Sequence, residues 1–195
     1  MTGLPTVSYR RSSPAGPAML AVLGVVLLGL PAGLAGQTHE HANRDHTSAY
    51  AGQQGREIAA LSPEEIDGLL AGEGMGMALP AELNGYPGPK HVLEMAGDLS
   101  LSADQRRQVE DIFAEMQATA REQGARLVAM EEELDQSFKD RTVTGERLAL
   151  LLSSIAGERA RLRETHLSAH LRLARVLSPE QVEEYTRLRG YQGGR

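Results

Sequence analysis

The stretch LSADQRRQVEDIFAEMQATAREQGARLVAMEEELDQSF, residues 101–138, decides the fold. Ser102 is placed as an N-cap with Gln105 three residues later, and such a pair opens helices by satisfying free backbone N–H groups. Apolar side chains then recur every three or four residues, as on one face of a helix. They are Val109, Ile112, Phe113, Met116, Ala120, Leu127, Met130, Leu134 and Phe138. The spacing predicts one helix of about 37 residues, roughly 55 Å long at 1.5 Å per residue.

A second amphipathic stretch follows the segment KDRTVTG, residues 139–145. Its β-branched residues and Gly145 favour a turn, and Thr144 can cap a helix that runs to Val176. The apolar stripe expected on that helix comprises Leu148, Leu152, Ile155, Leu162 and Leu173. A last short helix should open at Ser178, Pro179 and Gln181, with Val182, Tyr185 and Leu188 facing inward.

Two long helices joined by so short a turn should fold back as an antiparallel hairpin. This places the segment LSADQ (101–105) against LSPEQ (177–181) at the open end. A single seam of aliphatic side chains, at roughly 1.5 to 3 kcal/mol each, barely offsets the backbone entropy lost on folding. We therefore expect an all-α fold in which short flanking helices pack on the long hairpin and the hairpin dimerises.

Residues 1–35 have the features of a secretory signal peptide. Arg10 and Arg11 precede the apolar run MLAVLGVVLLGL, which is too short to span a bilayer, and Gly33 and Ala35 form a small-residue cleavage site. An uncleaved membrane anchor is the alternative, and the arginine pair leaves open general or twin-arginine export. The sequence predicts a periplasmic protein, cleaved after Ala35, that keeps no stable membrane insertion.

The remaining chain divides by composition. Residues 36–55 are polar and without periodicity, which predicts a disordered arm, and this arm carries His39, His41 and His46. Residues 56–97 hold a short capped helix and a Gly/Pro-rich connector whose role the sequence does not indicate. Residues 98–190 form the expected hairpin domain, and residues 191–195 form a tail.

Composition excludes several classes of function. The chain has no cysteine, so neither disulfides nor thiolates are possible, and with no tryptophan and seven Phe and Tyr residues its core must be aliphatic. After cleavage the formal charge is about −8, which makes nucleic acid an unlikely partner. No catalytic motif is present, and carboxylates such as Glu131, Glu132 and Glu133 fit a solvated helix face. We expect a binding protein and not an enzyme.

The two boxes carry a resemblance to a known family. Leu101-Ser-Ala-Asp-Gln105 and Leu177-Ser-Pro-Glu-Gln181 resemble the twin LTxxQ motifs of the Spy/CpxP group of periplasmic proteins, with serine in place of threonine. The resemblance covers roughly residues 98–190. We interpret the motif residues as helix caps and staples that lock the open end, without a catalytic role. They are Leu101, Ser102, Gln105, Leu177, Ser178 and Gln181.

The resemblance implies one of two activities. Spy-like members are ATP-independent chaperones that hold unfolded client proteins on a dimeric cradle, and CpxP-like members also restrain a membrane stress sensor. Other members are heavy-metal sensors or resistance proteins that bind ions through His, Met and carboxylate side chains. The chaperone function is preferred because it needs no special ligands, although this chain is acidic where the Spy cradle is basic.

The metal-binding alternative has its own candidate ligands. His166 and His170 are four residues apart, so both imidazoles lie on one helix face, and the hairpin register places Glu115 and Met116 opposite them. Imidazole with carboxylate or thioether suits Zn, Cu, Ni or Co, although no cofactor is required. The competing interpretation is that both histidines only pack along the stripe. Further ligands could come from the arm, namely His39, His41 and His46, whereas Met75 and Met77 are interpreted as flexible filler in a glycine-rich stretch.

Overall fold

The computed structural model describes residues 48–191. The predicted signal peptide, the cleavage site at Ala35 and the arm histidines His39, His41 and His46 lie outside the described residues, as do residues 192–195. Within the described part there are six α-helices and no strand, which confirms the all-α fold class for this part of the chain. No described helix combines the length and the apolar character needed to span a bilayer.

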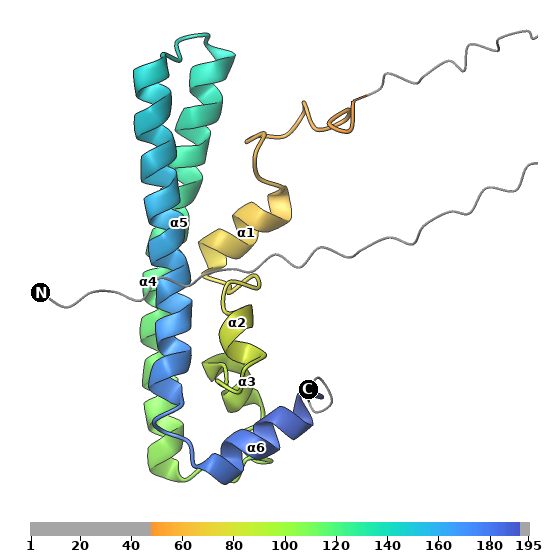
Figure 1. Ribbon diagram of the computed structural model, residues 1–195, viewed down its shortest axis with the longest axis vertical. Helices are drawn as coiled ribbons and strands as arrows, with labels where there is room; N and C mark the ends of the chain where they lie inside the picture. Colours follow the sequence, from red (N-terminus) through yellow and green to blue (C-terminus); the bar gives the residue numbers. More distant parts are fainter. Residues whose placement is uncertain (1–47, 192–195) are drawn as a thin grey trace, which may run out of the picture. The chain divides into compact units, whose positions relative to one another are not determined.

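The two long helices form the backbone of the structure. Helix α4 (Ala103–Lys139) and helix α5 (Gly145–Leu173) lie side by side and run in opposite directions, joined by residues 140–144 (Figure 1). A capping box opens α4, in which the Ser102 hydroxyl accepts from the Gln105 backbone N–H and the Gln105 side chain accepts from the Ser102 N–H. Thr144 caps α5 by accepting from the Arg147 N–H at 3.2 Å. Local capping chemistry therefore sets where both long helices begin.

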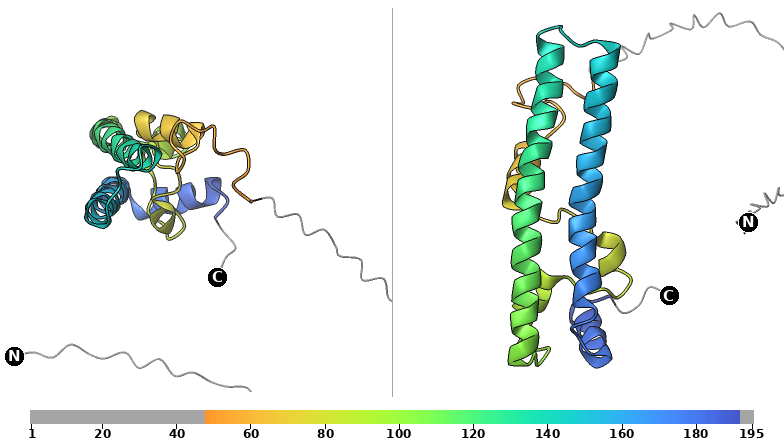
Figure 2. Two further views of the ribbon diagram at one scale, coloured as in Figure 1. Left: turned by 90° about the horizontal axis from the view of Figure 1, so that it is seen from above. Right: turned by 90° about the vertical axis from the view of Figure 1, so that its left-hand side faces the viewer.

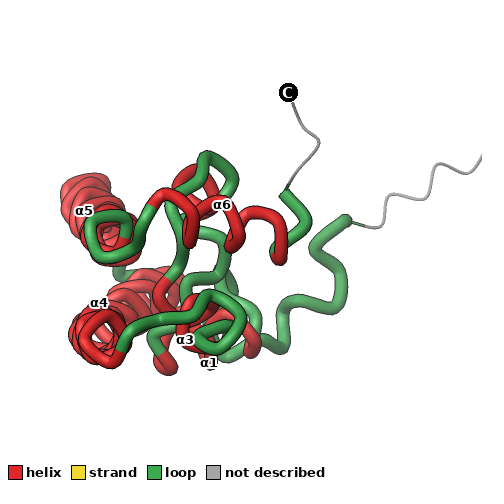
Figure 3. The backbone as a smooth tube through the Cα atoms, turned by 90° about the horizontal axis from the view of Figure 1, so that it is seen from below, coloured by secondary structure: helices red, strands yellow, loops and turns green. Residues whose placement is uncertain are grey.

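Four shorter helices all lie on one side of the α4–α5 pair (Figures 2 and 3). They are α1 (Pro63–Ala71), α2 (Leu79–Glu82), α3 (Pro89–Glu94) and α6 (Pro179–Leu188). Three of them belong to the connector, for which the sequence indicated no role. In these views no described element covers the opposite side of the α4–α5 pair.

Helix α1 packs on α4 at a glycine. A Cβ atom at Gly124 would lie only 2.0 Å from the backbone oxygen of Leu69, so the two helix backbones can approach this closely only because Gly124 has no side chain. A glycine inside a helix costs conformational entropy, and here the close contact offsets that cost.

The buried apolar side chains form two clusters along the long helices. The first joins the connector to the middle of α4 and α5, and the second joins α3 and α6 to their open end. The first contains Ile58, Leu61, Leu69, Ala120, Leu127, Ile155 and Leu162; the second contains Val92, Leu99, Val109, Leu173, Leu177 and Tyr185. Along α5, His166 and His170 fall between Leu162 and Leu173, and therefore between the two clusters.

Several predicted inward positions are wrong. On α5 the buried residue is Leu151, whereas Leu152 is 48% exposed, because the buried face continues in steps of three and four from Ile155 and passes through Leu151. Phe138 and Leu188 are exposed as well, since each lies close to the end of its helix. Helix α5 ends at Leu173 and not at Val176, because residues 174–177 turn the chain into α6.

The acidic face of α4 is also less solvated than expected. Glu131 is only 5% exposed and pairs with Arg159 of α5 at 2.6 Å. Glu158 of α5 is 1% exposed and accepts from Arg126 and Arg161. Burial raises the pKa of Glu158, but hydrogen bonds from Arg161 and Arg126 outweigh it and hold that pKa below its ordinary value. Charge pairs thus run between the two long helices where the sequence suggested free carboxylates.

Candidate functional site

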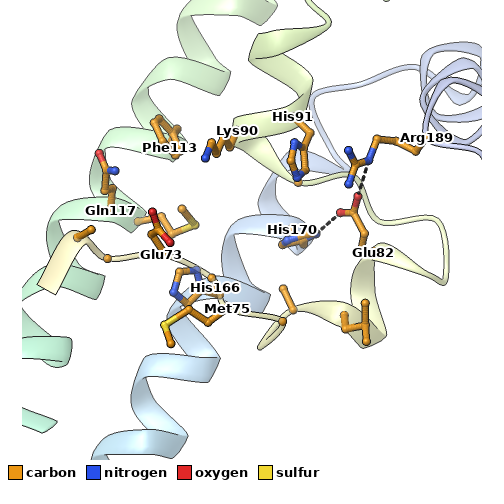
Figure 4. Close-up of a pocket in the computed structure, with 18 of the residues that line it drawn as sticks. Glu73, Met75, Glu82, Lys90, His91, Phe113, Gln117, His166, His170 and Arg189 are labelled. Atoms are coloured by element: carbon orange, nitrogen blue, oxygen red, sulfur yellow. Dashed lines mark ion pairs between the residues drawn. The ribbon is translucent and has the colours of Figure 1, made fainter. Parts of the chain in front are cut away.

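A cavity of about 460 Å³ opens between the two core clusters. Its walls come from α4, from α5, from the loop after α1, from α2 and α3, and from the segment after α6 (Figure 4). Side chains with lone pairs line it, among them His166 and His170 of α5 and Met116 of α4. The structure therefore brings three of the sequence-predicted metal ligands to one space.

His166 is the most unusual residue of this cavity. Its side chain is 3% exposed, and its Nε2 atom is buried without a hydrogen-bond partner. Burial, together with the neighbouring His170, lowers the pKa of His166 below its ordinary value, so the ring is neutral at physiological pH. A buried ring nitrogen without a partner costs free energy in a folded protein, which calls for an explanation at this position.

His170 lies one helical turn further along α5 and is oriented by the connector. Its Nδ1 is 2.7 Å from the Tyr86 carbonyl oxygen, which can only accept, so Nδ1 carries the proton in this contact. In the neutral ring Nε2 is then the nitrogen with the free lone pair. A Cβ at Gly88 would lie 3.1 Å from His170 Cε1, so a side chain at position 88 would crowd the ring.

A hydrogen-bonded network around Glu82 closes the cavity beside His170. Glu82 Oε1 accepts from the hydroxyls of Tyr185 and Tyr191 and lies 3.3 Å from Arg189 Nε, and Glu82 Oε2 lies 3.9 Å from His170 Nδ1. Burial raises the pKa of the Tyr185 hydroxyl, and its hydrogen bond to Glu82 raises it further. Tyr185 therefore remains a donor and ties α2 to α6.

The loop after α1 forms the wall next to His166. Glu73 and Met75 both line the cavity, and in Figure 4 the Met75 side chain lies beside the His166 ring. A Cβ at Gly74 would lie 3.7 Å from His166 Nδ1. The glycine-rich segment is thus in contact with the histidine, although the sequence suggested that it only filled space.

Glu115 does not lie with the histidines, which corrects the expected ligand set. Its side chain is 64% exposed and pairs with Arg172 at 2.8 Å, on a second cavity that Thr119 also lines. The hairpin register placed Glu115 and Met116 together, but consecutive residues of a helix point about 100° apart, so only Met116 reaches the histidine cavity.

His91 of α3 lines the cavity as well, and its Nδ1 pairs with Glu94 Oε2 at 2.8 Å. Its contribution was not visible in the sequence, because the connector has no periodicity that would place it. The same holds for Glu73, Met75 and Glu82. Proximity to His166 and His170 comes only from how the connector packs on the long helices.

The two LSxxQ boxes lie together at the open end of α4 and α5. Gln105 Nε2 donates to Gln181 Oε1 at 2.8 Å, and Gln181 Nε2 donates to Gln105 Oε1 at 3.1 Å. Ser178 caps α6 in the same way as Ser102 caps α4. Leu177 belongs to the second core cluster and Leu101 packs against it. These six motif residues make structural contacts and lie apart from the cavity.

Comparison of the chain with protein-family models, with curated proteins and with solved structures finds no match. Function must therefore be argued from the site.

The His, Asp and Glu side chains of the described residues do not by themselves form a complete metal site. Between residues 48 and 191 no group of three or more His, Asp or Glu side chains is placed to hold a metal ion. His166 and His170 bring two imidazoles to the cavity, and Met116 lines it with a thioether.

Proposed function

We propose that this chain is an exported protein of the Spy/CpxP type that binds a transition-metal ion at His166 and His170. The observation that carries the proposal is the buried His166 Nε2 without a partner, in the wall of a cavity that His170 also lines. A bound ion would satisfy this nitrogen. We thus place metal binding before chaperone activity, whereas the sequence favoured chaperone activity.

The chemistry of the residues fits a transition metal. Metal ions bind neutral imidazole, and the lowered pKa of His166 keeps its ring neutral. The hydrogen bond from His170 Nδ1 to the Tyr86 carbonyl is the kind of contact that orients a ligating imidazole and leaves Nε2 for the ion. With the Met116 thioether, this donor set suits Zn, Cu, Ni or Co. The ion would supply binding energy between α5 and its neighbours.

The sequence also predicts ligands on the arm, residues 36–55, which lies mostly outside the described residues. His39, His41 and His46 precede the described residues and offer up to three more imidazoles.

Calorimetric titration of the full chain with Zn²⁺, Cu²⁺ and Ni²⁺ tests this function. The double variant His166→Leu/His170→Leu should lose most of the affinity, while deletion of residues 37–48 should weaken it only partly. The control is Gln123→Leu, which replaces a buried polar residue on the other long helix, α4, outside the histidine cavity. Equal affinities in the double variant and the control would reject the proposal and leave the histidines as packing residues.

Chaperone activity is the second candidate, favoured by apolar side chains near the turn. Phe138, Leu150 and Leu152 are 54%, 64% and 48% exposed, and exposed apolar surface of this kind can hold unfolded clients or a second copy of the chain. Equimolar protein should then delay aggregation of a denatured test substrate without ATP, and the triple serine variant should not. No delay at roughly tenfold excess of folded, dimeric protein would argue against this function.

A further inference from the structure

The loop after α1 is fixed directly on α4. Gly72 ends α1 with φ at +70°, and a Cβ there would lie 2.8 Å from the Gln117 oxygen and 3.1 Å from the Arg121 nitrogen. Arg121 Nε also donates to the Ala71 oxygen at 3.2 Å. The loop is thus held in contact with the helix backbone, and its glycines permit the contact.

Met75 has an unusual conformation within this loop. Its φ is +44°, in the left-handed region that side chains other than glycine rarely adopt. Met75 is 43% exposed, so burial in the core does not explain the conformation. Strained residues of this kind gather at binding sites, where the surrounding structure holds them.

The neighbouring helix makes room for the Met75 sulfur. A Cβ at Gly68 would lie 2.8 Å from Met75 Sδ, so any other residue at position 68 would displace the thioether. Met75 and His166 lie next to each other in Figure 4, and Met116 lines the same cavity from α4. One buried imidazole nitrogen without a partner thus shares a cavity with two thioethers from different elements.

We propose that Met75 and Met116 join His166 as ligands of a soft monovalent cation, copper(I), in this cavity. The proposal rests on the metal-binding function above and names its ion. Thioethers favour copper(I) over the harder divalent ions, and copper(I) accepts few ligands. The donor set also agrees with the absence, between residues 48 and 191, of three grouped His, Asp or Glu ligands.

Met77 provides a matched control two residues away. It packs against the first core cluster, whereas Met75 lines the cavity. Leucine conserves the volume of methionine but removes the sulfur, so both variants should fold. A difference between them reports on the sulfur at the cavity.

The test is a competition titration of the full chain against a chromophoric copper(I) chelator without oxygen, repeated with Ag⁺ as a surrogate that does not change oxidation state. Met75→Leu should weaken copper(I) and Ag⁺ binding by roughly tenfold or more, and Met116→Leu should do the same. Met77→Leu should bind as the parent chain does. The Zn²⁺ affinity should change by less than about twofold in Met75→Leu and in Met77→Leu.

Methionine methyl NMR gives a second readout. Adding Ag⁺ to the parent chain should shift the methyl resonances of Met75 and Met116 and leave that of Met77 in place. Unchanged copper(I) affinity in Met75→Leu, with binding lost only in the histidine double variant, would overturn the thioether ligands and keep the histidine site. Absence of all metal binding in the parent chain would overturn both proposals.

Discussion

At the scale of single residues, His166 is the residue that sets the cavity apart, because its burial favours the neutral ring over the charged one. Burial of the His166 side chain and the neighbouring His170 on the same helix face both lower the pKa of His166. The Tyr86 carbonyl offers a partner to His170, but Nε2 of His166 has none. Protonation of His166 therefore destabilises the folded chain relative to the unfolded one.

The lowered pKa of His166 makes the stability of the folded chain depend on pH. In the unfolded chain the pKa of His166 is about 6.5, and folding lowers this pKa. Below pH 6.5 the unfolded state thus binds more protons, and the free energy of unfolding of the metal-free protein should fall as pH drops, by up to about 1.4 kcal/mol per pH unit. Above that range the contribution of His166 is fully present and constant.

Denaturant unfolding between pH 8 and pH 5 measures this dependence. The variant His166→Leu should have a shallower loss of stability on acidification, and Gln123→Leu should follow the parent chain. Parallel curves for His166→Leu and the parent would mean that His166 is protonated as readily in the folded state as in the unfolded state.

At the scale of elements, the helix ends depend on a few polar side chains. The Ser178 hydroxyl accepts from the Gln181 N–H at 3.3 Å, while Gln181 itself joins Gln105 across the open end. Each glutamine thus caps its own helix and also bonds the other box. The boxes couple α4 to α6, which are far apart in sequence.

Substitutions should measure two contributions separately, the cap at Ser178 and the contact between Gln105 and Gln181. Ser178→Ala should lower the free energy of unfolding by about 0.5 to 2 kcal/mol through the lost cap. A double-mutant cycle of Gln105→Ala and Gln181→Ala should give a coupling of about 0.5 to 3 kcal/mol, because the two amides contact each other. Additive single effects would contradict the contact.

Two glycines of the long helices make a matched pair. At Gly124 a Cβ would meet the Leu69 oxygen at 2.0 Å, whereas at Gly157 the nearest atom belongs to the flexible end of Arg161 at 3.7 Å. Gly124→Ala should therefore destabilise by roughly 1 to 3 kcal/mol, through the overpacked α1–α4 contact. Gly157→Ala should stabilise by about 0.5 to 1 kcal/mol, as alanine does inside a helix.

Thermal or denaturant unfolding of the two variants gives the comparison. Since both changes are the same substitution in a helix interior, the opposite signs isolate the packing of α1 on α4. A stabilised Gly124→Ala variant would mean that the connector does not pack on α4 in solution as it does in the structure.

At the scale of the whole molecule, the helices were predictable and the cavity was not. Ser102, Thr144 and Ser178 mark helix starts by local chemistry, and the apolar spacing of α4 extends over its full 37 residues. The connector has no such periodicity, so nothing in the sequence placed Met75 or Glu82 beside α5. Its glycines suggested looseness, whereas Gly68, Gly72 and Gly88 permit close contacts.

The role of the histidine pair could not be predicted from the sequence either. The spacing of His166 and His170 predicted a shared face, but whether the pair packs or binds depends on what faces it. Two core clusters interrupted by a cavity, and a ring nitrogen without a partner, are properties of the packed chain. Glu131 is buried and pairs with Arg159 of the facing helix, and the sequence of α4 alone gives no sign of this partner.

The central claim is that His166 and His170 bind a metal ion, and imidazole ¹⁵N NMR of the full chain tests it most directly. Adding one equivalent of Zn²⁺, which is diamagnetic, should move the Nε2 resonances of both α5 histidines to the position of a metal-bound nitrogen. The Nδ1 of His170 should remain protonated toward Tyr86. Shifts confined to His39, His41 and His46, with His166 and His170 unchanged, would contradict the account and assign the pair to packing.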